Sequence, residues 1–158
     1  MLKDKYMYRW QNTAKREQLF EFLIKLYTKF EIERAGLGVA SSERIERYHE
    51  TPSEKFDYII RYNNKEYYVD VSGAWKYPPW IQMSKLEYAR RYGVEDRAWI
   101  AWLDTRRIAF YFILASRALK LSENAKRVKL ANEPNEYIVI PLKHWINFRK
   151  WVSIMMMG

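Results

Sequence analysis

The chain contains no cysteine and only two histidines, and these two shortages exclude several kinds of site. Without thiols there can be no disulfides and no thiolate ligands for zinc, and His49 and His144 lie too far apart to form a zinc motif. A cysteine-free chain fits a reducing compartment or a hot environment better than a small secreted scaffold. No Gly-x-Ser-x-Gly or P-loop motif occurs, so nucleophilic acyl chemistry and P-loop nucleotide binding have no support.

Long apolar runs are also missing. No uncharged stretch approaches the length of about 18 residues that a membrane span requires. The first ten residues carry charges and lack the apolar core of a secretion signal, so we expect a cytoplasmic protein. Among the 158 residues there is no repeat, no low-complexity tract and no linker rich in Gly, Ser or Pro. We therefore expect a single domain over residues 1–158.

Basic residues are in excess. Lys and Arg number 28 against 19 Asp and Glu, which gives a formal net charge of +9. Such an excess favours a polyanionic partner, with nucleic acid first and an acidic membrane second, although some small basic proteins are merely soluble. Aromatic residues make up 17% of the chain, and together with the many charged residues they lean toward a thermophilic source.

Hydrophobic periodicity and turn residues predict a mixed α+β protein. We expect a central sheet of four to five strands, built around a hairpin and flanked by helices. Helices are expected over residues 13–34, 81–92 and 116–131, and from Pro141 onward, where proline suits the first helical position. Strands are expected over residues 56–62, 66–72, 99–104, 108–114 and 137–140.

The expected hairpin, "KFDYIIRYNNKEYYVDVSG", carries one aspartate on each strand. If Asn63 and Asn64 form a two-residue loop, Asp57 lies directly across from Asp70, with β-carbons about 5 Å apart. Like charges at that distance destabilise a hairpin, so a shared cation, a bridging Lys or Arg, or a raised pKa must offset the cost. A divalent ion such as Mg²⁺ fits, because it is often held by one or two carboxylates.

Two other interpretations of the hairpin stay open. Arg61 or a lysine could neutralise the two aspartates at a solvated sheet edge, and a longer loop would shift the register. In the two-residue register, Ile59, Tyr68 and Ser72 share the aspartate face. The opposite face is wholly apolar or aromatic, so we expect it to face the core; it carries Phe56, Tyr58, Ile60, Tyr67, Val69 and Val71.

The order of these segments resembles the PD-(D/E)xK nuclease superfamily. A leading helix, "FDYII", a turn, "YYVDVSG", a helix and an aromatic strand match it over about residues 15–115. The resemblance implies that Asp57 and Asp70 bind Mg²⁺ or Mn²⁺ and that a lysine two positions later activates water. Ser72 occupies that lysine position, so the role passes to another residue or the site is inactive.

Three residues are candidates to complete the site. Lys85, on the following helix, stands where this lysine is sometimes displaced in the family, and Lys76 lies in the loop before it. Glu87 is a candidate third metal ligand or general base. The alternatives are a solvated Lys85 and a helical ion pair of Glu87 with Arg90 or Arg91.

Two weaker resemblances stand beside the first. Gly36 and Gly38 with Ser41, followed by the aspartates, are similar to minimal nucleotidyltransferases, but Ile59 stands where their second acid is expected. The basic, cysteine-free and aromatic-rich character resembles small proteins of filamentous archaeal viruses, among them nucleases of Acidianus filamentous viruses that act on double-stranded DNA. That resemblance implies a location inside the host cell.

A second group of residues is expected to bind the nucleic acid. Exposed aromatics in "WKYPPW" beside a lysine could stack on bases, or could instead cover the core. Arginines could follow the phosphate backbone. The residues in this group are Trp75, Lys76, Arg90, Arg91, Arg106 and Arg107. The C-terminal "WVSIMMM" is expected to be core or the face of a homodimer.

The sequence thus predicts a metal-dependent nuclease acting on double-stranded DNA. Its expected catalytic residues are Asp57, Asp70, Lys85 and Glu87. The alternative is a non-catalytic DNA-binding protein on a degenerate nuclease or nucleotidyltransferase-like fold.

Overall fold

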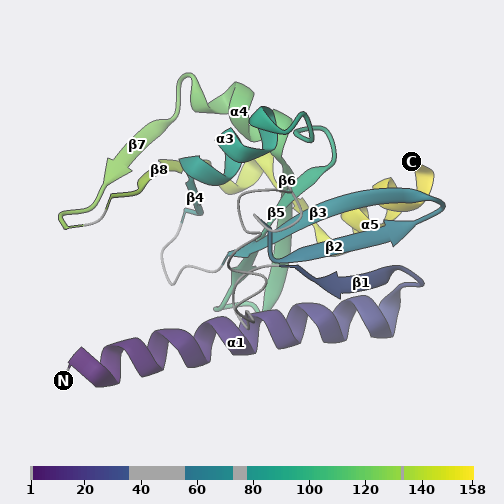
Figure 1. The fold of residues 1–158 in the computed structure, drawn as a ribbon, viewed down its shortest axis with the longest axis horizontal. Helices are drawn as coiled ribbons and strands as arrows, with labels where there is room; N and C mark the ends of the chain where they lie inside the picture. The colour runs from purple at the N-terminus through teal and green to yellow at the C-terminus, as the bar shows by residue number, and fades with distance from the viewer. Residues whose placement is uncertain (1, 36–55, 73–77, 133) are drawn as a thin grey trace.

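A six-stranded mixed sheet organises the protein in the computed structural model, which describes residues 2–35, 56–72, 78–132 and 134–158 (Figure 1). Its strand order is β1-β2-β3-β5-β6-β9, and β3 and β5 are its parallel pair. A second sheet has the order β4-β8-β7. The predicted α+β class is confirmed, and the central sheet is slightly larger than expected.

The bounds of the elements are as follows. The strands are β1 (Glu31–Arg34), β2 (Tyr58–Tyr62), β3 (Lys65–Ser72), β4 (Trp80–Gln82), β5 (Ala98–Asp104), β6 (Ala109–Leu114), β7 (Lys126–Lys129), β8 (Glu136–Val139) and β9 (Ile146–Asn147). The helices are α1 (Leu2–Tyr27), α3 (Met83–Arg91), α4 (Ala115–Ser122) and α5 (Phe148–Met157), with a 3₁₀ turn at Leu142–His144.

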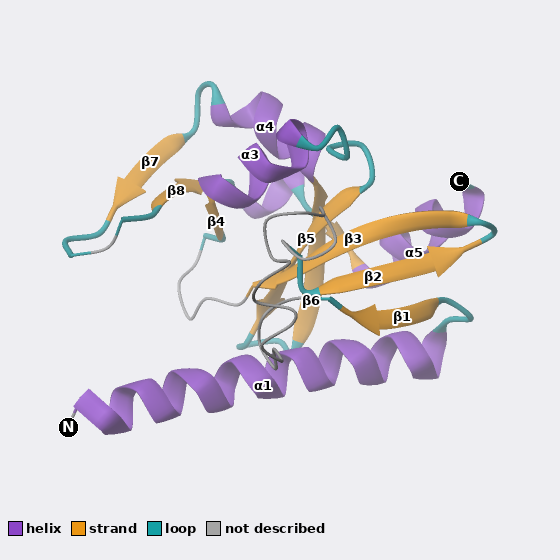
Figure 2. Ribbon diagram, viewed as in Figure 1, coloured by secondary structure: helices purple, strands orange, loops and turns teal. Residues whose placement is uncertain are grey.

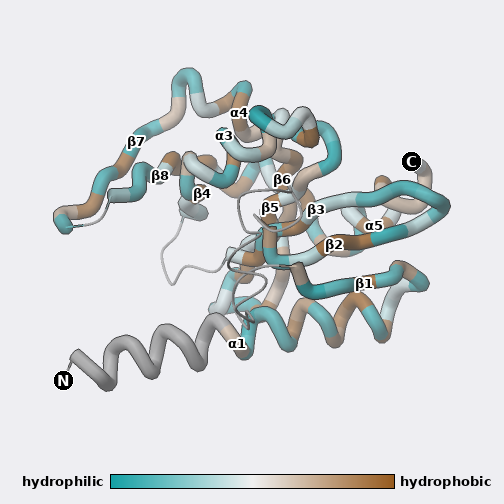
Figure 3. Tube along the Cα trace, in the orientation of Figure 1, coloured by the Kyte–Doolittle hydropathy of each residue, from teal (hydrophilic) through white to brown (hydrophobic). Residues whose placement is uncertain are grey.

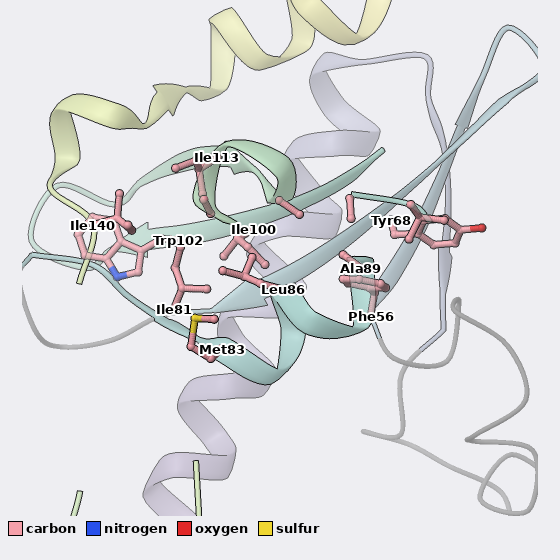
Figure 4. Close-up of a cluster of buried hydrophobic side chains, with 14 of the residues drawn as sticks. Phe56, Tyr68, Ile81, Met83, Leu86, Ala89, Ile100, Trp102, Ile113 and Ile140 are labelled. Atoms are coloured by element: carbon pink, nitrogen blue, oxygen red, sulfur yellow. The ribbon is translucent and has the colours of Figure 1, made fainter. Parts of the chain in front are cut away.

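Helices cover both faces of the six-stranded sheet (Figure 2). On one face α1 and α5 enclose an aromatic cluster in which Trp151 stacks on Phe112, with ring centroids 4.1 Å apart. Apolar stretches recur between polar ones along the C-terminal half of α1 (Figure 3), and its Phe20 and Ile24 are fully buried in this cluster. On the other face α3 and α4 cover a second apolar cluster that contains Leu86, Trp102 and Ile113 (Figure 4).

The first helix ends earlier than predicted. It stops at Tyr27 rather than near Arg34, and residues 31–34 form β1, in which Ile32 pairs with Ile60. The hydroxyl of Thr28 donates to the carbonyl of Ile24 and accepts from the amide of Phe30. These local bonds take up polar groups at the helix end and turn the chain into the sheet.

Two further predictions for the C-terminal half need correction. The helix expected over 116–131 ends at Ser122, and residues 126–129 form β7, because pairing with β8 overrides the helical pattern. The last helix does not begin at Pro141. It begins at Phe148, where the side chain of Asn147 accepts a hydrogen bond from the amide of Lys150 (2.8 Å) and caps the helix.

The helix predicted over residues 81–92 is confirmed. This second predicted helix is α3, which begins at Met83 after the short strand β4, and Gly93 follows its end with φ +68°. In the C-terminal "WVSIMMM", Met155 packs in the core, whereas Met157 is 84% exposed. No helix in the described ranges combines the length and the apolar character that a membrane crossing demands.

Candidate active site

The β2–β3 hairpin has the predicted register. Asn63 and Asn64 both have positive φ, +50° and +61°, as a two-residue hairpin turn requires. Tyr62 pairs with Lys65, and the pairing continues to Tyr58 opposite Val69. One step further along, Asp57 and Asp70 meet at the start of β2. The amide of Val71 donates to Oδ2 of Asp57 over 2.8 Å, which holds the carboxylate against β3.

The hairpin faces differ from expectation in one respect. Ile59 and Tyr68, on the aspartate side, are buried beneath α3, so both faces of the hairpin are covered by apolar clusters. Phe56 belongs to the α3 side, 5.7 Å from the ring of Tyr68, and not to the side of Tyr58. Because β2 begins at Tyr58, the alternation of the strand does not extend to Phe56.

The two carboxylates lie in a buried environment. Asp70 is only 8% exposed. Burial raises the pKa of Asp57 well above its usual range, and the negative charge of Asp70 raises it further. Lys85 and the amide of Val71 act in the opposite direction. The repulsion expected between the opposed aspartates therefore acts in the folded chain, where Lys85 and the Val71 amide oppose it.

Lys85 reaches this carboxylate pair from α3. Its Nζ lies 3.1 Å from Oδ1 of Asp70, and its side chain is 24% exposed. Ser72, at the expected lysine position of β3, donates instead to the carbonyl of Ala101 over 3.5 Å. Lys85 on α3 therefore supplies a positive charge next to Asp70, whereas Ser72, which stands at the expected lysine position, forms a hydrogen bond within the sheet.

The first helix adds two charged residues that the sequence reasoning missed, Arg16 and Glu17. The hydroxyl of Tyr58 donates to the carbonyl of Glu17 (3.3 Å), and the ring of Phe20 lies 5.3 Å from that of Tyr58. These contacts place this turn of α1 beside Asp57. A signal was present, because both residues lie one turn before Phe20 on the face that also buries Ile24.

The electrostatics tie these two residues to the aspartates. Burial raises the pKa of Glu17, with Arg34 opposing and Asp70 adding a smaller increase. Burial lowers the pKa of the Arg16 guanidinium, while Asp57 and Asp70 act to raise it. Arg16 therefore supplies a second positive charge, beside Lys85, that acts on the carboxylate pair.

Glu87 is not part of this cluster. It lies on α3 two residues after Lys85, and its side chain is exposed, as are those of Arg90 and Arg91. The helix turns Leu86 and Ala89 toward the sheet, so Glu87 projects away from the apolar cluster. Its predicted role as third ligand or base stays a prediction.

The predicted nucleic-acid contacts are separated in space or lie outside the description. Arg106 and Arg107 are exposed in the β5–β6 turn, where the Arg106 amide and side chain contact Oδ1 of Asp104 (3.0 and 3.5 Å). Trp75 and Lys76 lie outside the described residues, as do His49, Gly36, Gly38 and Ser41. Of the predicted contacts, the four arginines are therefore the ones that the described residues include.

The carboxylate pair fits a hard divalent cation. Within the described ranges no group of three or more His, Cys, Asp or Glu residues could hold a metal ion, so a cation here would have Asp57 and Asp70 as its protein ligands. Two carboxylates suffice for Mg²⁺, which keeps its remaining positions for water and phosphate oxygens. Burial, and after it the negative charge of Asp70, raises the pKa of Asp57, and a bound cation would act in the opposite direction.

Comparison with known proteins identifies the fold. No family model and no curated protein sequence matches the chain. A nuclease from a fusellovirus is similar in structure, with a TM-score of 0.54 and 19% identity over 96% of this chain and 89% of that one. The chain has a nuclease-like fold. The Holliday junction resolvase Hjc of Archaeoglobus fulgidus is also similar, with a TM-score of 0.52 and 15% identity over 89% of this chain and 94% of that one. The resemblance to PD-(D/E)xK nucleases is thereby confirmed at the level of the fold.

Proposed function

We propose that this protein is a metal-dependent nuclease that hydrolyses phosphodiester bonds of double-stranded DNA. The observation that carries the proposal is the pairing of the half-buried Asp57 with the buried Asp70, with the ammonium of Lys85 only 3.1 Å from Asp70. The nuclease-like fold supports it, because Asp70 lies on β3 and Asp57 directly precedes β2, close to the two positions that the resemblance to PD-(D/E)xK nucleases implies. The net charge of +9 supports a polyanionic substrate.

Asp57 and Asp70 would hold Mg²⁺ or Mn²⁺. Such an ion, when bound, polarises a phosphate and lowers the pKa of a bound water. Asp57 binds a cation as the carboxylate, so binding must displace the proton that its raised pKa favours. The hydrogen bond from the amide of Val71 would favour cation binding, because it fixes the orientation of the Asp57 carboxylate in advance.

Lys85 would stabilise the negative charge that develops on the phosphate during hydrolysis. Its ion pair with Asp70 orients the ammonium toward the carboxylates before substrate binds. Arg16 acts on the same carboxylates and would share this role. A proton acceptor for the attacking water is still required, and two glutamates compete for it: Glu17 on α1 and Glu87 on α3.

The basic surface would hold the duplex without reading its sequence. Contacts to phosphates position a protein on DNA and carry no sequence information. Candidates on the described surface are Arg90 and Arg91 on α3 and Arg106 and Arg107 in the β5–β6 turn. Trp75 and Lys76, which lie outside the described residues, remain proposed contacts.

A second candidate function is DNA binding without catalysis. Ser72 favours it, because a serine at the expected lysine position cannot supply positive charge. The two functions differ in one respect that can be measured: a binding protein has no turnover for an Asp70 variant to lose. Removing a carboxylate from a binding protein should tighten its affinity for DNA slightly, because one negative charge disappears from the interface.

The test is incubation with linear and circular double-stranded DNA in Mg²⁺, in Mn²⁺ and in EDTA. Alanine variants of Asp57, Asp70, Lys85, Glu17 and Glu87 are compared with wild type, and Glu123→Ala, an exposed acid at the end of α4, is the matched control. Metal-dependent cleavage that Asp70→Ala abolishes without loss of DNA affinity supports the nuclease. Intact DNA under every condition, with a mobility shift on a gel, overturns it in favour of the binding protein.

The two glutamates are separated in the same experiment. A general base should lose turnover when it is changed to Gln, while metal affinity, measured with Mn²⁺, stays near that of wild type. A metal ligand should lose both. The glutamate that retains full turnover as Gln has neither role.

A further inference from the structure

The outer hairpin β7–β8 has no role in the proposed chemistry, yet its first strand is strongly basic. Three of its four residues are exposed basic side chains, Lys126, Arg127 and Lys129. In the order β4-β8-β7, this strand is the outermost of the small sheet. Figure 1 shows the hairpin projecting from the body of the protein beyond α4. Its basic side chains are therefore presented away from the two apolar clusters.

The hairpin is nevertheless firmly attached beside the candidate active site. Ile138 of β8 is fully buried with Ile81 of β4 in the cluster beneath α3. Tyr137 pairs with Gln82, which is the N-cap residue of α3 and lies three residues before Lys85. The basic strand is thus joined through two hydrogen-bonded strands to the start of the helix that carries Lys85.

The dimensions suit a duplex that enters the site. Neighbouring strands lie about 4.8 Å apart, so β7 is about 10 Å from β4. Half a turn of B-DNA spans about 17 Å, so the separation of β7 from β4 is shorter than half a turn of a duplex. A two-stranded ribbon is also narrow enough to enter the major groove.

We propose that the β7–β8 hairpin is an arm that binds the phosphate backbone of double-stranded DNA beside the candidate active site. The identity of the substrate rests on the proposed function. Arg127 forms an ion pair with Glu136 across the hairpin, so the phosphate contacts are assigned to Lys126 and Lys129. The competing explanation is that lysines on an outer strand prevent edge-to-edge association of copies of the chain.

The experiment measures binding of a fluorescent DNA duplex by anisotropy in EDTA, at several salt concentrations. The double variant Lys126→Ala/Lys129→Ala should bind about 10- to 100-fold more weakly at 0.1 M salt, and its slope of log K against log salt should be shallower by about 2. This double variant and the control variant described next must both show the circular dichroism spectrum of wild type.

The matched control is Lys25→Ala/Lys29→Ala, two exposed lysines at the end of α1 and just beyond it. It removes the same net charge. If both double variants lost the same amount of DNA affinity, net charge alone would explain the effect and the proposed role of the hairpin would be wrong. Unchanged binding by the β7 variant would overturn it as well, and self-association of that variant would then support edge protection. EDTA prevents metal-dependent cleavage, so this assay measures binding alone. If the wild type bound DNA but never cut it, the nuclease proposal would be wrong, whereas the proposed role of the hairpin in DNA binding would still hold.

Discussion

The two faces of the six-stranded sheet are covered by similar apolar side chains, but they differ in the buried carboxylates that they carry. The face beneath α1 and α5 buries an aromatic cluster around Phe20, Phe112 and Trp151. In the described chain, the buried carboxylates Asp70 and Asp104 belong to strand positions that alternate onto the face beneath α3 and α4. We infer that one face supplies stability, whereas the other gives up some stability to assemble the site. Each prediction below tests this division.

The largest expected effect is on the aromatic face. Trp151→Ala should lower the free energy of unfolding by about 3–5 kcal/mol, because it removes a fully buried ring that stacks on Phe112. Denaturant unfolding measures the loss. Trp151→Phe, which keeps an aromatic ring, should lose much less, and Met157→Ala, at an exposed position, should stay within about 0.5 kcal/mol of wild type. At low temperature, cleavage per folded molecule of Trp151→Ala should equal that of wild type. If the folded variant cut DNA more slowly, the face beneath α1 and α5 would contribute to the site as well as to stability.

The next effect is on the site. Lys85→Ala should reduce kcat about 10²- to 10³-fold, because it removes the positive charge next to Asp70, while affinity for DNA changes little. Single-turnover cleavage and anisotropy measure the two quantities. Lys120→Ala, at an exposed position on α4, is the control and should cut like wild type. If Lys85→Ala retained more than half of the activity, Lys85 would be only a structural partner of Asp70.

A smaller effect of opposite sign is expected for the stability of the metal-free protein. Asp57→Asn should raise the free energy of unfolding by about 0.5–2 kcal/mol, because burial and Asp70 both disfavour the charge of Asp57. Asp70→Asn should gain less, since it also removes the ion-pair partner of Lys85. Both variants should lose cleavage. Thermal unfolding in EDTA measures the stability, and a less stable Asp57→Asn would show that the charge is well accommodated.

The smallest effect is the pH dependence of that stability. The folded-state pKa of Asp57 is raised, so between the unfolded and folded pKa values the folded chain binds more protons than the unfolded chain. The metal-free protein should therefore lose stability as pH rises through this window, by at most about 1.4 kcal/mol per pH unit. Melting temperature against pH in EDTA measures the trend. Asp57→Asn should flatten this contribution, and an equal slope in the variant would assign it to other groups.

The parts of the molecule that could be predicted are those controlled by local chemistry. The Asn63-Asn64 turn and the alternation of its flanking strands determine the register that opposes Asp57 and Asp70. Four short strands, β1, β4, β7 and β9, were not predicted. Of these, β1 and β7 are four residues each, and both formed because a neighbouring strand offered pairing partners. Helical periodicity within residues 31–34 and 126–129 carried no information about those partners.

The sequence by itself determined the hairpin, the opposed carboxylates and the basic net charge, because turn geometry and side-chain alternation act over a few residues. Only the tertiary structure decided that Lys85 on α3 would contact Asp70 and that the charges of Arg16 and Glu17 on α1 would act on the carboxylates. The positions of these side chains depend on how α3 and α1 pack against the sheet. That packing is set by the apolar clusters on the two faces of the sheet. The same packing leaves Glu87 exposed, although it lies only two residues from Lys85, since neighbouring positions on a helix face different directions.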